Sequence, residues 1–470
     1  MALSVTFCGG AETVTGSNFL VEHVPENSAG GNRGKVLIDC GIEQGRDFCA
    51  ECVYGPFPYS PASIDALIVT HAHLDHVGRA PKLVKDGFRG KVLMTSATRD
   101  LAELILKDSV GILAGEAQRL HRDPLYSMED VDRFLSLIEP IPYRTEHVVA
   151  PGLSVYLRDT GHILGSASVR VRAEDGTAMA FTGDIGNWPS PYLPDPEPIT
   201  DADAILTESV YGDRIHEHRD DRVGELKDAM KRAIDRGGAI LMPAFSMERT
   251  QLMLYELSNL FAAKELPHIP VFLDSPLAIA VTDVYKKHAD AYFKPAAVDE
   301  MDREHDIFGF PFLTKTRSRE ESRDIQKTGN PKLIIAGAGM SHGGRIGIWE
   351  QQYLGDPTTT LFIVGYQAPG SPGRMLQEGA PKVRIEGREV RVRAKVETLT
   401  AWSAHADRDG LLAFAGEALR RTKTFFVGLG EPSSARFLAQ RIHDYLGVKA
   451  VVPTAGERWE VAKNSIRKSR

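Results

Sequence analysis

Short apolar runs, each ending at polar or glycine-rich turns, recur along the whole chain of 470 residues. In the first part of the chain they predict strands at 4–7, 35–39, 64–69, 91–95, 153–158 and 178–182. After residue 204 the pattern changes to alternating strands and helices, expected at 239–242, 248–263, 270–273, 279–292, 332–336, 345–354 and 360–364. The sequence therefore predicts an α/β protein with a Rossmann-like second unit. No glycine-rich loop follows the first strand of that unit, so a dinucleotide site is not expected.

The strand expected at 64–69 leads directly into an unusual polar stretch at 70–78. This stretch places three imidazoles and one carboxylate within six positions, as His71, His73, Asp75 and His76. Imidazole nitrogen and carboxylate oxygen bind zinc at about 2.0–2.2 Å. A solvated polar turn rarely gathers so many metal-binding groups, so the stretch predicts a metal site at the end of a strand.

Composition is that of an ordinary globular protein long enough for two domains. Hydrophobic residues make up 42% of the chain, and no apolar run reaches the roughly 18–20 residues that a membrane span needs. The N-terminus lacks a basic segment followed by an apolar one, so a secretion signal is not expected. Four cysteines are too few for a disulfide scaffold, which favours a cytoplasmic protein. The pair Cys49 and Cys52 is interpreted as loop cysteines, with a metal site as the less favoured alternative.

Charge is distributed unevenly along the chain. The net charge is −7, but residues 380–470 hold 18 Lys and Arg against 10 Asp and Glu. That segment carries +8 and the rest of the chain carries −15. The basic segment is either a solvated face or a surface that meets phosphates.

The His-x-His-x-Asp-His pattern resembles the signature of the metallo-β-lactamase superfamily, whose fold is an αββα sandwich. Within that resemblance, His162 follows the strand at 153–158 and Asp184 follows the strand at 178–182. Asp39, at the end of the strand at 35–39, would orient the metal histidines. The resemblance implies two metal sites, the first held by His71, His73, His162 and Asp184, and the second by Asp75, His76 and the shared Asp184.

Further stretches resemble the β-CASP group of this superfamily, which includes bacterial and archaeal RNA-processing enzymes and the eukaryotic mRNA 3′-end endonuclease. These stretches lie, in the family order, at 208–212, 243–251, 273–278, 337–340 with 343–345, 365–367 and 403–407. The resemblance runs from about residue 7 to about residue 452. It implies a metallo-β-lactamase domain at 1–210 and 395–470, interrupted by a Rossmann-like β-CASP domain at 211–394. Substrate would lie between the two domains.

The resemblance also implies a zinc-dependent hydrolase that cleaves phosphodiester bonds of single-stranded RNA, in RNA processing or decay. A metal-activated hydroxide, oriented by Asp75, would attack the phosphorus. His405 would protonate the leaving oxygen, and Glu208 would hold its imidazolium in place. Six polar groups would meet phosphates: Arg249, Ser341, His342, Arg345, Arg374 and Ser403.

One position departs from the family pattern. Leu429 stands where the group usually has a further histidine that completes the second metal site. We therefore expect one tight zinc site and a second, weaker site. An aliphatic residue here also resembles the DNA-acting repair branch, whereas the stretches at 343–345 and 365–367 resemble the RNA-acting branch, which we favour.

Three alternatives to an RNA nuclease follow from these observations. The first is a DNA nuclease of the repair branch, and the second is a catalytically impaired member that only binds nucleic acid. The third is a small-molecule hydrolase such as a thioesterase, for which the inserted domain has no evident use. Retention of the whole set from His71 to His405 disfavours an impaired member. The sequence leaves open endonuclease against 5′-exonuclease action and whether the chain forms a homodimer, and it predicts no membrane partner.

Overall fold

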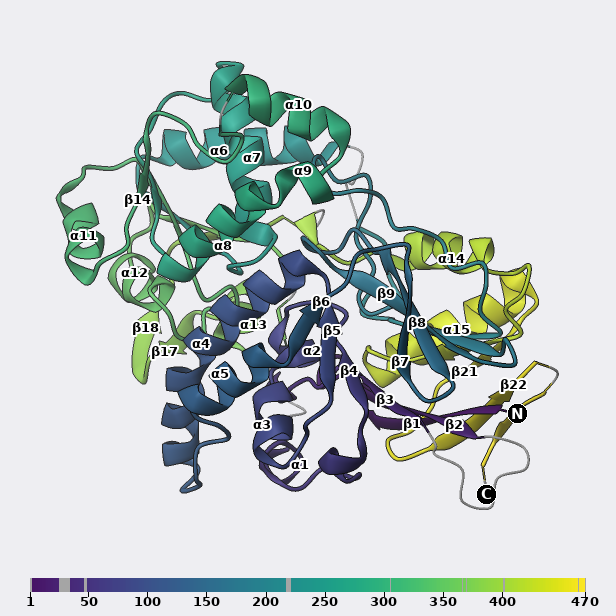
Figure 1. Cartoon of the computed structure of the whole chain (residues 1–470). Coiled ribbons are helices and arrows are strands. Elements are labelled where there is room, and N and C mark those ends of the chain that lie inside the picture. The colour runs from purple at the N-terminus through teal and green to yellow at the C-terminus, as the bar shows by residue number, and fades with distance from the viewer. Residues whose placement is uncertain are drawn as a thin grey trace. The chain divides into compact units, whose positions relative to one another are not determined.

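The computed structural model describes residues 2–24, 34–45, 49–216, 221–304, 306–365, 367–368, 370–399, 402–463 and 465–469 (Figure 1). The chain forms two compact units, Met1–Ile215 with His405–Arg470 (unit 1) and His216–Ala404 (unit 2). The sequence places these boundaries at 210 and 394. The second boundary differs because residues 395–398 form a strand in the sheet of unit 2.

Unit 1 contains two mixed β-sheets in the described residues. The eight-stranded sheet has the order β23-β22-β1-β2-β3-β4-β5-β6, and the seven-stranded sheet has the order β21-β20-β11-β10-β9-β8-β7. The strands of the first sheet are β1 (Ala2–Gly9), β2 (Asn18–Val24), β3 (Lys35–Ile38), β4 (Ala66–Ile68), β5 (Lys91–Met94), β6 (Ile138–Pro140), β22 (Arg458–Ala462) and β23 (Ser465–Lys468). Those of the second are β7 (Glu146–Ala150), β8 (Leu153–Asp159), β9 (Ala167–Ala173), β10 (Ala178–Phe181), β11 (Ala204–Thr207), β20 (Thr424–Val427) and β21 (Lys449–Val451).

The main core of unit 1 lies between these two sheets. Phe7 of β1 packs against Phe426 of β20 with ring centroids 5.3 Å apart, and Phe19 of β2 packs against Phe181 of β10 at 5.6 Å. All four rings are buried. Aromatic pairs of this kind add about 0.5–1.5 kcal/mol beyond the burial of their apolar area. Because side chains alternate along a strand, the other residues of β10, β11 and β20 lie on the opposite face of the second sheet.

Helices cover the outer faces of both sheets, which gives the αββα sandwich predicted from the sequence. Helices α14 and α15 pack on the second sheet through a separate apolar cluster, and Figure 1 shows α3, α4 and α5 beside the strands β4 to β6 of the first. The helices of unit 1 are α1 (Ala50–Tyr54), η2 (Pro61–Ser63), α2 (Leu74–Val77), α3 (Ala80–Lys85), α4 (Ser96–Arg119), α5 (Met128–Ser136), α14 (Arg408–Glu417) and α15 (Pro432–Leu446). Across the described residues, none of the helices has the length and apolar character needed to cross a membrane.

Unit 2 is built on a parallel sheet with the order β14-β13-β15-β12-β16-β19, as the strand–helix alternation predicts. Its strands are β12 (Ala239–Pro243), β13 (Val271–Leu273), β14 (Leu313–Lys315), β15 (Lys332–Ala336), β16 (Thr360–Ile363) and β19 (Lys395–Thr398), with a hairpin of β17 (Lys382–Ile385) and β18 (Arg388–Arg391). Its helices are α6 (Arg222–Arg236), α7 (Arg249–Ala262), α8 (Pro276–Lys287), α9 (Ala289–Tyr292), α10 (Pro295–Glu304), α11 (Arg319–Asp324), η4 (Ile325–Lys327), α12 (Ile346–Tyr353) and α13 (Pro372–Gln377). Buried β12 and β15 read as continuous apolar runs because helices cover parallel sheets on both faces.

Two of the four cysteines are joined by a disulfide, Cys49 to Cys52. Cys49 is the N-cap of α1, so one helical turn brings the two sulfurs together. This differs from the loop thiols expected from the sequence. Among the described residues Cys8 and Cys40 remain free, and Cys40 is buried.

Candidate metal centre

The polar stretch predicted as a metal site lies at the end of β4. His71 follows that strand, and His73 is the N-cap of the short helix α2, with extended backbone. The loop after β3 holds this helix through two backbone hydrogen bonds, from Cys40 N–H to His76 O (2.8 Å) and from Ile42 N–H to Leu74 O (2.9 Å). The motif is therefore fixed on both sides by main-chain contacts.

His162 and Asp184 reach the same place from the second sheet. His162 lies in the turn between β8 and β9, where Ser166 Oγ accepts hydrogen bonds from the N–H groups of His162 (3.1 Å) and Ile163 (3.3 Å). Asp184 follows β10 and comes directly after Gly183, which has φ +57°. A Cβ atom on Gly183 would lie 2.9 Å from Thr70 Cβ, so only glycine lets this turn approach the β4 motif.

Four donor atoms from these segments converge on one point. His71 Nε2 lies 3.1 Å from His73 Nδ1, which lies 3.3 Å from His162 Nε2. Asp184 Oδ2 lies 3.4 Å from Nε2 of both His71 and His162. Four ligands placed tetrahedrally at about 2.0–2.1 Å from a zinc ion would be about 3.3–3.4 Å from one another. The four side chains thus fit a tetrahedral metal ion without rearrangement.

The protonation of the cluster also fits a bound cation. Burial lowers the pKa of His71, His73 and His162, so these imidazoles are neutral and offer lone pairs. His73 Nδ1 lies within hydrogen-bonding distance of a ring nitrogen of His71 and of His162, and a single ring nitrogen can form only one of these two bonds well. A cation at their centre resolves this conflict.

Asp39 organises the histidines from behind the cluster. Its carboxylate accepts hydrogen bonds from Ser17 Oγ (2.8 Å), Thr70 N (2.8 Å) and Thr70 Oγ1 (3.0 Å). It also lies 2.7 Å from His76 Nδ1. Although burial acts in the opposite direction, the carboxylates of Asp184 and Asp39 raise the pKa of His76 well above its usual value, so a metal ion bound at Nε2 would have to displace a proton. Asp39 has φ +57°, a conformation that Asp tolerates better than most residues.

The second predicted donor set is less complete. His76 Nε2 lies 3.4 Å from Asp184 Oδ1 and is buried without a hydrogen-bond partner in the described residues. Asp75 belongs to neither group of donors that lie within 4.8 Å of one another at this centre. Leu429 is buried in the core between the sheets, with its Cδ2 against Gly10. Its side chain therefore supplies packing rather than a donor.

A histidine and a glutamate stand beside the cluster. Residue His405 pairs with Gly186 in a short β-bridge, and its Nδ1 lies 3.3 Å from Glu208 Oε1 and 3.9 Å from Asp184 Oδ2. Glu208 is fully buried and accepts a hydrogen bond from Ile185 N (2.5 Å). Although burial acts in the opposite direction, the carboxylates of Glu208 and Asp184 raise the pKa of His405 to about 9. The His405 side chain keeps 21% of its surface exposed, so a proton on it is accessible.

The six predicted phosphate-binding groups belong to unit 2 and lie in varied surroundings. Arg345 donates to Asp274 Oδ1 (2.6 Å), Thr316 O (3.2 Å) and Arg317 O (3.0 Å). Two more have internal partners, since Ser341 Oγ donates to Glu350 Oε1 (2.5 Å) and Arg374 Nε to Glu378 Oε1 (2.6 Å). The other three differ in burial. Arg249 and Ser403, which have contacts of their own, are buried, and His342 is exposed.

Some residues at this centre were not predicted as site residues. Thr70 and Ser166 stand inside the stretches that contain predicted ligands, so their adjacency was an available signal. No sequence signal pointed to Ser17, because it is 22 positions away from Asp39, the residue that it contacts. Only the fold brings these two residues together.

Comparison with known proteins covers most of the chain. Residues 19–210 match the metallo-beta-lactamase superfamily, 250–376 the Beta-Casp domain, and 389–453 the Zn-dependent metallo-hydrolase RNA specificity domain. The chain is 37% identical over 404 residues to ribonuclease TTHA0252 of Thermus thermophilus (86% of this chain, 88% of the relative). It is 29% identical over 456 residues to transcription termination factor FttA of Methanosarcina mazei (95% of this chain, 69% of the relative). A crystal structure of a protein of unknown function from Enterococcus faecalis V583 shares the fold, with a TM-score of 0.57, 10% identity and coverage of 98% of this chain and 100% of that one.

Proposed function

The chain belongs to the β-CASP group of the metallo-β-lactamase superfamily, a group that includes metal-dependent ribonucleases, and on that premise we propose that it hydrolyses phosphodiester bonds in single-stranded RNA. We assign the metallo-β-lactamase domain to unit 1 and the β-CASP domain to unit 2. The cytoplasmic location predicted from the cysteine content is kept as part of this proposal.

The proposal rests chiefly on Asp184, which connects a metal-binding cluster to a proton donor. Its Oδ2 lies 3.4 Å from two cluster histidines and 3.9 Å from Nδ1 of His405. Hydrolysis of a phosphodiester needs positive charge beside the phosphorus and a proton for the leaving oxygen. Both requirements are met within a few ångströms of one carboxylate.

Each residue of the centre has a role in this proposal. Zinc held by the cluster would act as a Lewis acid and lower the pKa of water to about 7. Asp75 orients the attacking water. His405 delivers its proton to the leaving oxygen, and Glu208 stabilises the imidazolium through Nδ1. Asp39 orients His76 through Nδ1.

We propose one tight zinc site and a second, weaker one. The tight site has four donors that already lie at tetrahedral spacing. The second site would rest on His76, the other oxygen of Asp184 and Asp75. Leu429 contributes no donor to it, so fewer protein ligands hold the second ion and its affinity is lower.

We propose phosphate contacts for the same six groups, of which His342 is the exposed one among Arg249, His342 and Ser403. Ser341, Arg345 and Arg374 bond within unit 2. Their use as phosphate ligands would require those internal bonds to break.

Cleavage of end-labelled single-stranded RNA and of DNA with the same sequence tests the proposal. The zinc-loaded chain is expected to cut RNA, and Asp184→Asn is expected to cut neither strand. Preferential cutting of DNA would support the repair-type alternative. RNA binding without cutting of either strand would support a catalytically impaired member and make Leu429 the first position to restore as histidine.

A further inference from the structure

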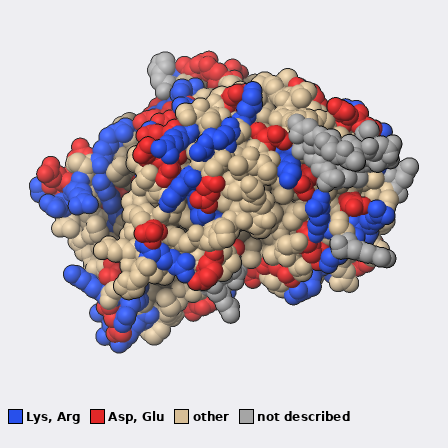
Figure 2. Space-filling view, turned by 60° about the horizontal axis from the view of Figure 1, so that its bottom comes forward, with Lys and Arg blue, Asp and Glu red and all other residues tan. Residues whose placement is uncertain are grey.

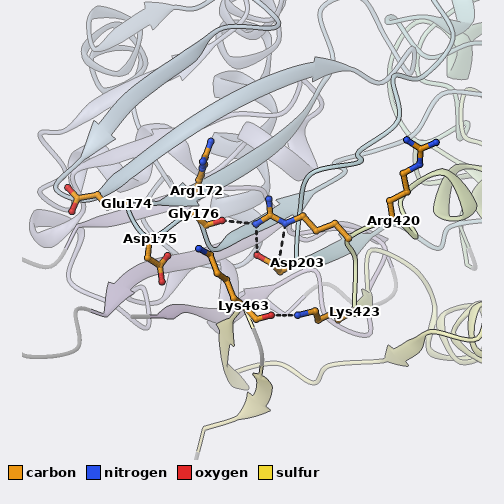
Figure 3. A pocket seen from close by; sticks show the side chains of 9 residues that line it. Arg172, Glu174, Asp175, Gly176, Asp203, Arg420, Lys423 and Lys463 are labelled. Atoms are coloured by element: carbon orange, nitrogen blue, oxygen red, sulfur yellow. Dashed lines mark hydrogen bonds and ion pairs between the residues drawn. The ribbon is translucent and has the colours of Figure 1, made fainter.

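A hollow lined almost entirely by charged side chains lies in unit 1 at the opposite end of the second sheet from the metal centre (Figure 3). Its volume is about 540 Å³, within the range of ligand-sized pockets. Its lining, which we call the basic hollow, comprises Arg172, Glu174, Asp175, Gly176, Asp203, Arg420, Arg421, Lys423 and Lys463.

Strand direction separates the basic hollow from the metal centre. Strands β10, β11 and β20 are parallel. Asp203 and Lys423 come directly before β11 and β20, whereas Asp184 and Glu208 follow β10 and β11. The eight steps from Gly176 to Asp184 include the extended strand β10 and can span up to about 27 Å. The basic hollow is therefore a separate place on the same unit.

Two of the three carboxylates in the basic hollow already have hydrogen-bond donors. Asp203 accepts hydrogen bonds from Ala178 N (2.9 Å) and from Arg421 Nη2 (2.8 Å). Asp175 accepts one from Thr177 N (2.8 Å). In Figure 3 the Glu174 carboxylate is directed away from the lysines, while that of Asp175 faces Lys463. The acids thus neutralise only part of the positive charge.

Three of the five cations of the basic hollow come from separate segments and lack ion-pair partners in the described residues, whereas Arg421 pairs with Asp203 and Lys423 donates to Lys463 O. Within the described residues, the side chains of Arg172, Arg420 and Lys463 form no hydrogen bond or ion pair within 4 Å, whereas most other basic groups of unit 1 do. A Cβ atom on Gly176 would lie 3.4 Å from Lys463 Nζ and 3.7 Å from Arg172 Nη2. These two cations therefore approach the same point above the turn. Their repulsion is relieved if an anion occupies that point.

The side chains that line the basic hollow indicate which kind of anion could bind there. The basic hollow has no aromatic or apolar side chain against which a base could stack. Arg and Lys bind phosphates, and contacts to phosphates carry no base information. The surface in Figure 2 mixes basic and acidic groups throughout the face in view. Phosphate binding by this chain would thus depend on local sites rather than on one broad positive field.

We propose that the basic hollow is an exosite that binds backbone phosphates of RNA outside the metal centre. This inference rests on the proposed function, because it takes RNA as the substrate. A long RNA engages both places, and a short RNA engages only the metal centre. The basic hollow then increases the affinity for long RNA without touching the scissile bond.

The test compares a variant of the basic hollow with a matched control. Arg420→Gln with Lys463→Gln removes two cations of the lining, and Arg119→Gln with Arg436→Gln removes two exposed cations elsewhere on unit 1. Affinity for long RNA is measured over a range of salt concentrations. The loss of two phosphate contacts makes the slope of log affinity against log salt less steep by about 1.4. The control is expected to keep the wild-type slope.

Cleavage of a short RNA by the same proteins separates this inference from the proposed function. If all three proteins cut short RNA equally and only the basic-hollow variant loses affinity for long RNA, the exosite is supported. Equal slopes for the basic-hollow variant and wild type would overturn it while leaving cleavage intact. Binding of inorganic phosphate that depends on Lys463, with no change for RNA, would overturn the RNA assignment. Absence of cleavage in wild type would refute the proposed function, and the binding slopes would still test the basic hollow.

Discussion

The metal centre of unit 1 and the predicted phosphate-binding residues of unit 2 were both proposed from short motifs, yet they behave differently in the fold. In unit 1 the side chains of His71, His73 and His162 converge with neutral nitrogens facing one another. In unit 2 Arg345 is bound to a buried carboxylate and two carbonyls, and Ser341 to Glu350. The histidines contact mainly one another and Asp184, an arrangement that a metal ion would explain. Arginine and serine often bond to other groups of the fold, so a motif that contains them can indicate local structure as well as a ligand site.

The largest effect is expected at His405, at the boundary of the metal centre. Replacing His405 with Gln removes the general acid and is expected to slow RNA cleavage by about 10²–10⁴-fold. Zinc content should stay unchanged, because His405 is proposed as a proton donor. Single-turnover rates and zinc content are measured together, with the exposed His443→Gln as control. Loss of zinc from His405→Gln would instead make it a metal ligand.

Arg345 tests the predicted phosphate-binding residues of unit 2. Its partner Asp274 is fully buried, and Arg345→Gln leaves that carboxylate without a counter-charge, with only the neutral donors Thr316, Ser322 and Trp349. The variant should lower the free energy of unfolding by about 3 kcal/mol, the low end for breaking a buried ion pair. Arg374→Gln breaks only an exposed pair and should change it by less than about 1 kcal/mol. Chemical denaturation measures both variants. If Arg345→Gln keeps the wild-type stability but binds RNA more weakly, Arg345 would be a phosphate ligand rather than a structural residue.

Glu350 gives unit 2 a pH dependence that arises away from the metal centre. Burial raises the pKa of Glu350 from its usual 4.5 to about 7, against the effect of the Ser341 hydrogen bond. Folding therefore favours the protonated acid. The resulting stability is complete below pH 4.5 and is lost as the pH rises towards 7, by up to about 3 kcal/mol. Denaturation at about pH 5 and about pH 8 should show this loss, and Glu350→Gln should abolish it. An unchanged pH dependence in Glu350→Gln would contradict the assignment.

The smallest effect is expected at Ser17, which reaches the metal centre only through Asp39. Ser17→Ala removes one of the hydrogen bonds to the Asp39 carboxylate and should weaken zinc binding by about 10-fold, at the low end for such supporting residues. Competition with a chelator measures this affinity. The buried Ser109→Ala, whose hydroxyl bonds within α4, serves as control. Equal zinc affinity in both variants would show that Ser17 does not support metal binding.

Much of the fold followed from the sequence because its signals are local. Apolar runs marked several strands in both sheets of unit 1, but not β2, β6, β7, β9, β22 or β23. The strand–helix alternation marked β12, β13, β15 and β16 of the parallel sheet of unit 2, but not β14 or β19. The return to unit 1 was placed near Lys395 instead of His405, because β19 joins unit 2 by pairing with β16, a contact between distant segments. The disulfide between Cys49 and Cys52 was likewise not expected.

The candidate site could be predicted to the extent that its chemistry is unusual. His71, His73, His162 and Asp184 were proposed as one ligand set, and the fold brings their donor atoms to within 3.1–3.4 Å along four contacts. Ser17 could not be predicted, since a serine in a turn has many structural uses. The basic hollow was foreseen only as an excess of charge in residues 380–470, because Arg172 comes from a different part of the chain.

The account depends most on the claim that the cluster containing His73 holds the metal that drives RNA hydrolysis. The most direct measurement is cleavage of single-stranded RNA by metal-stripped protein as zinc is added back, with His73→Ala beside wild type. No cleavage is expected without metal. Cleavage should return with zinc in wild type and stay absent in His73→Ala, whose circular dichroism should match that of wild type. Full cleavage by the metal-stripped chain, or by folded His73→Ala, would contradict the account.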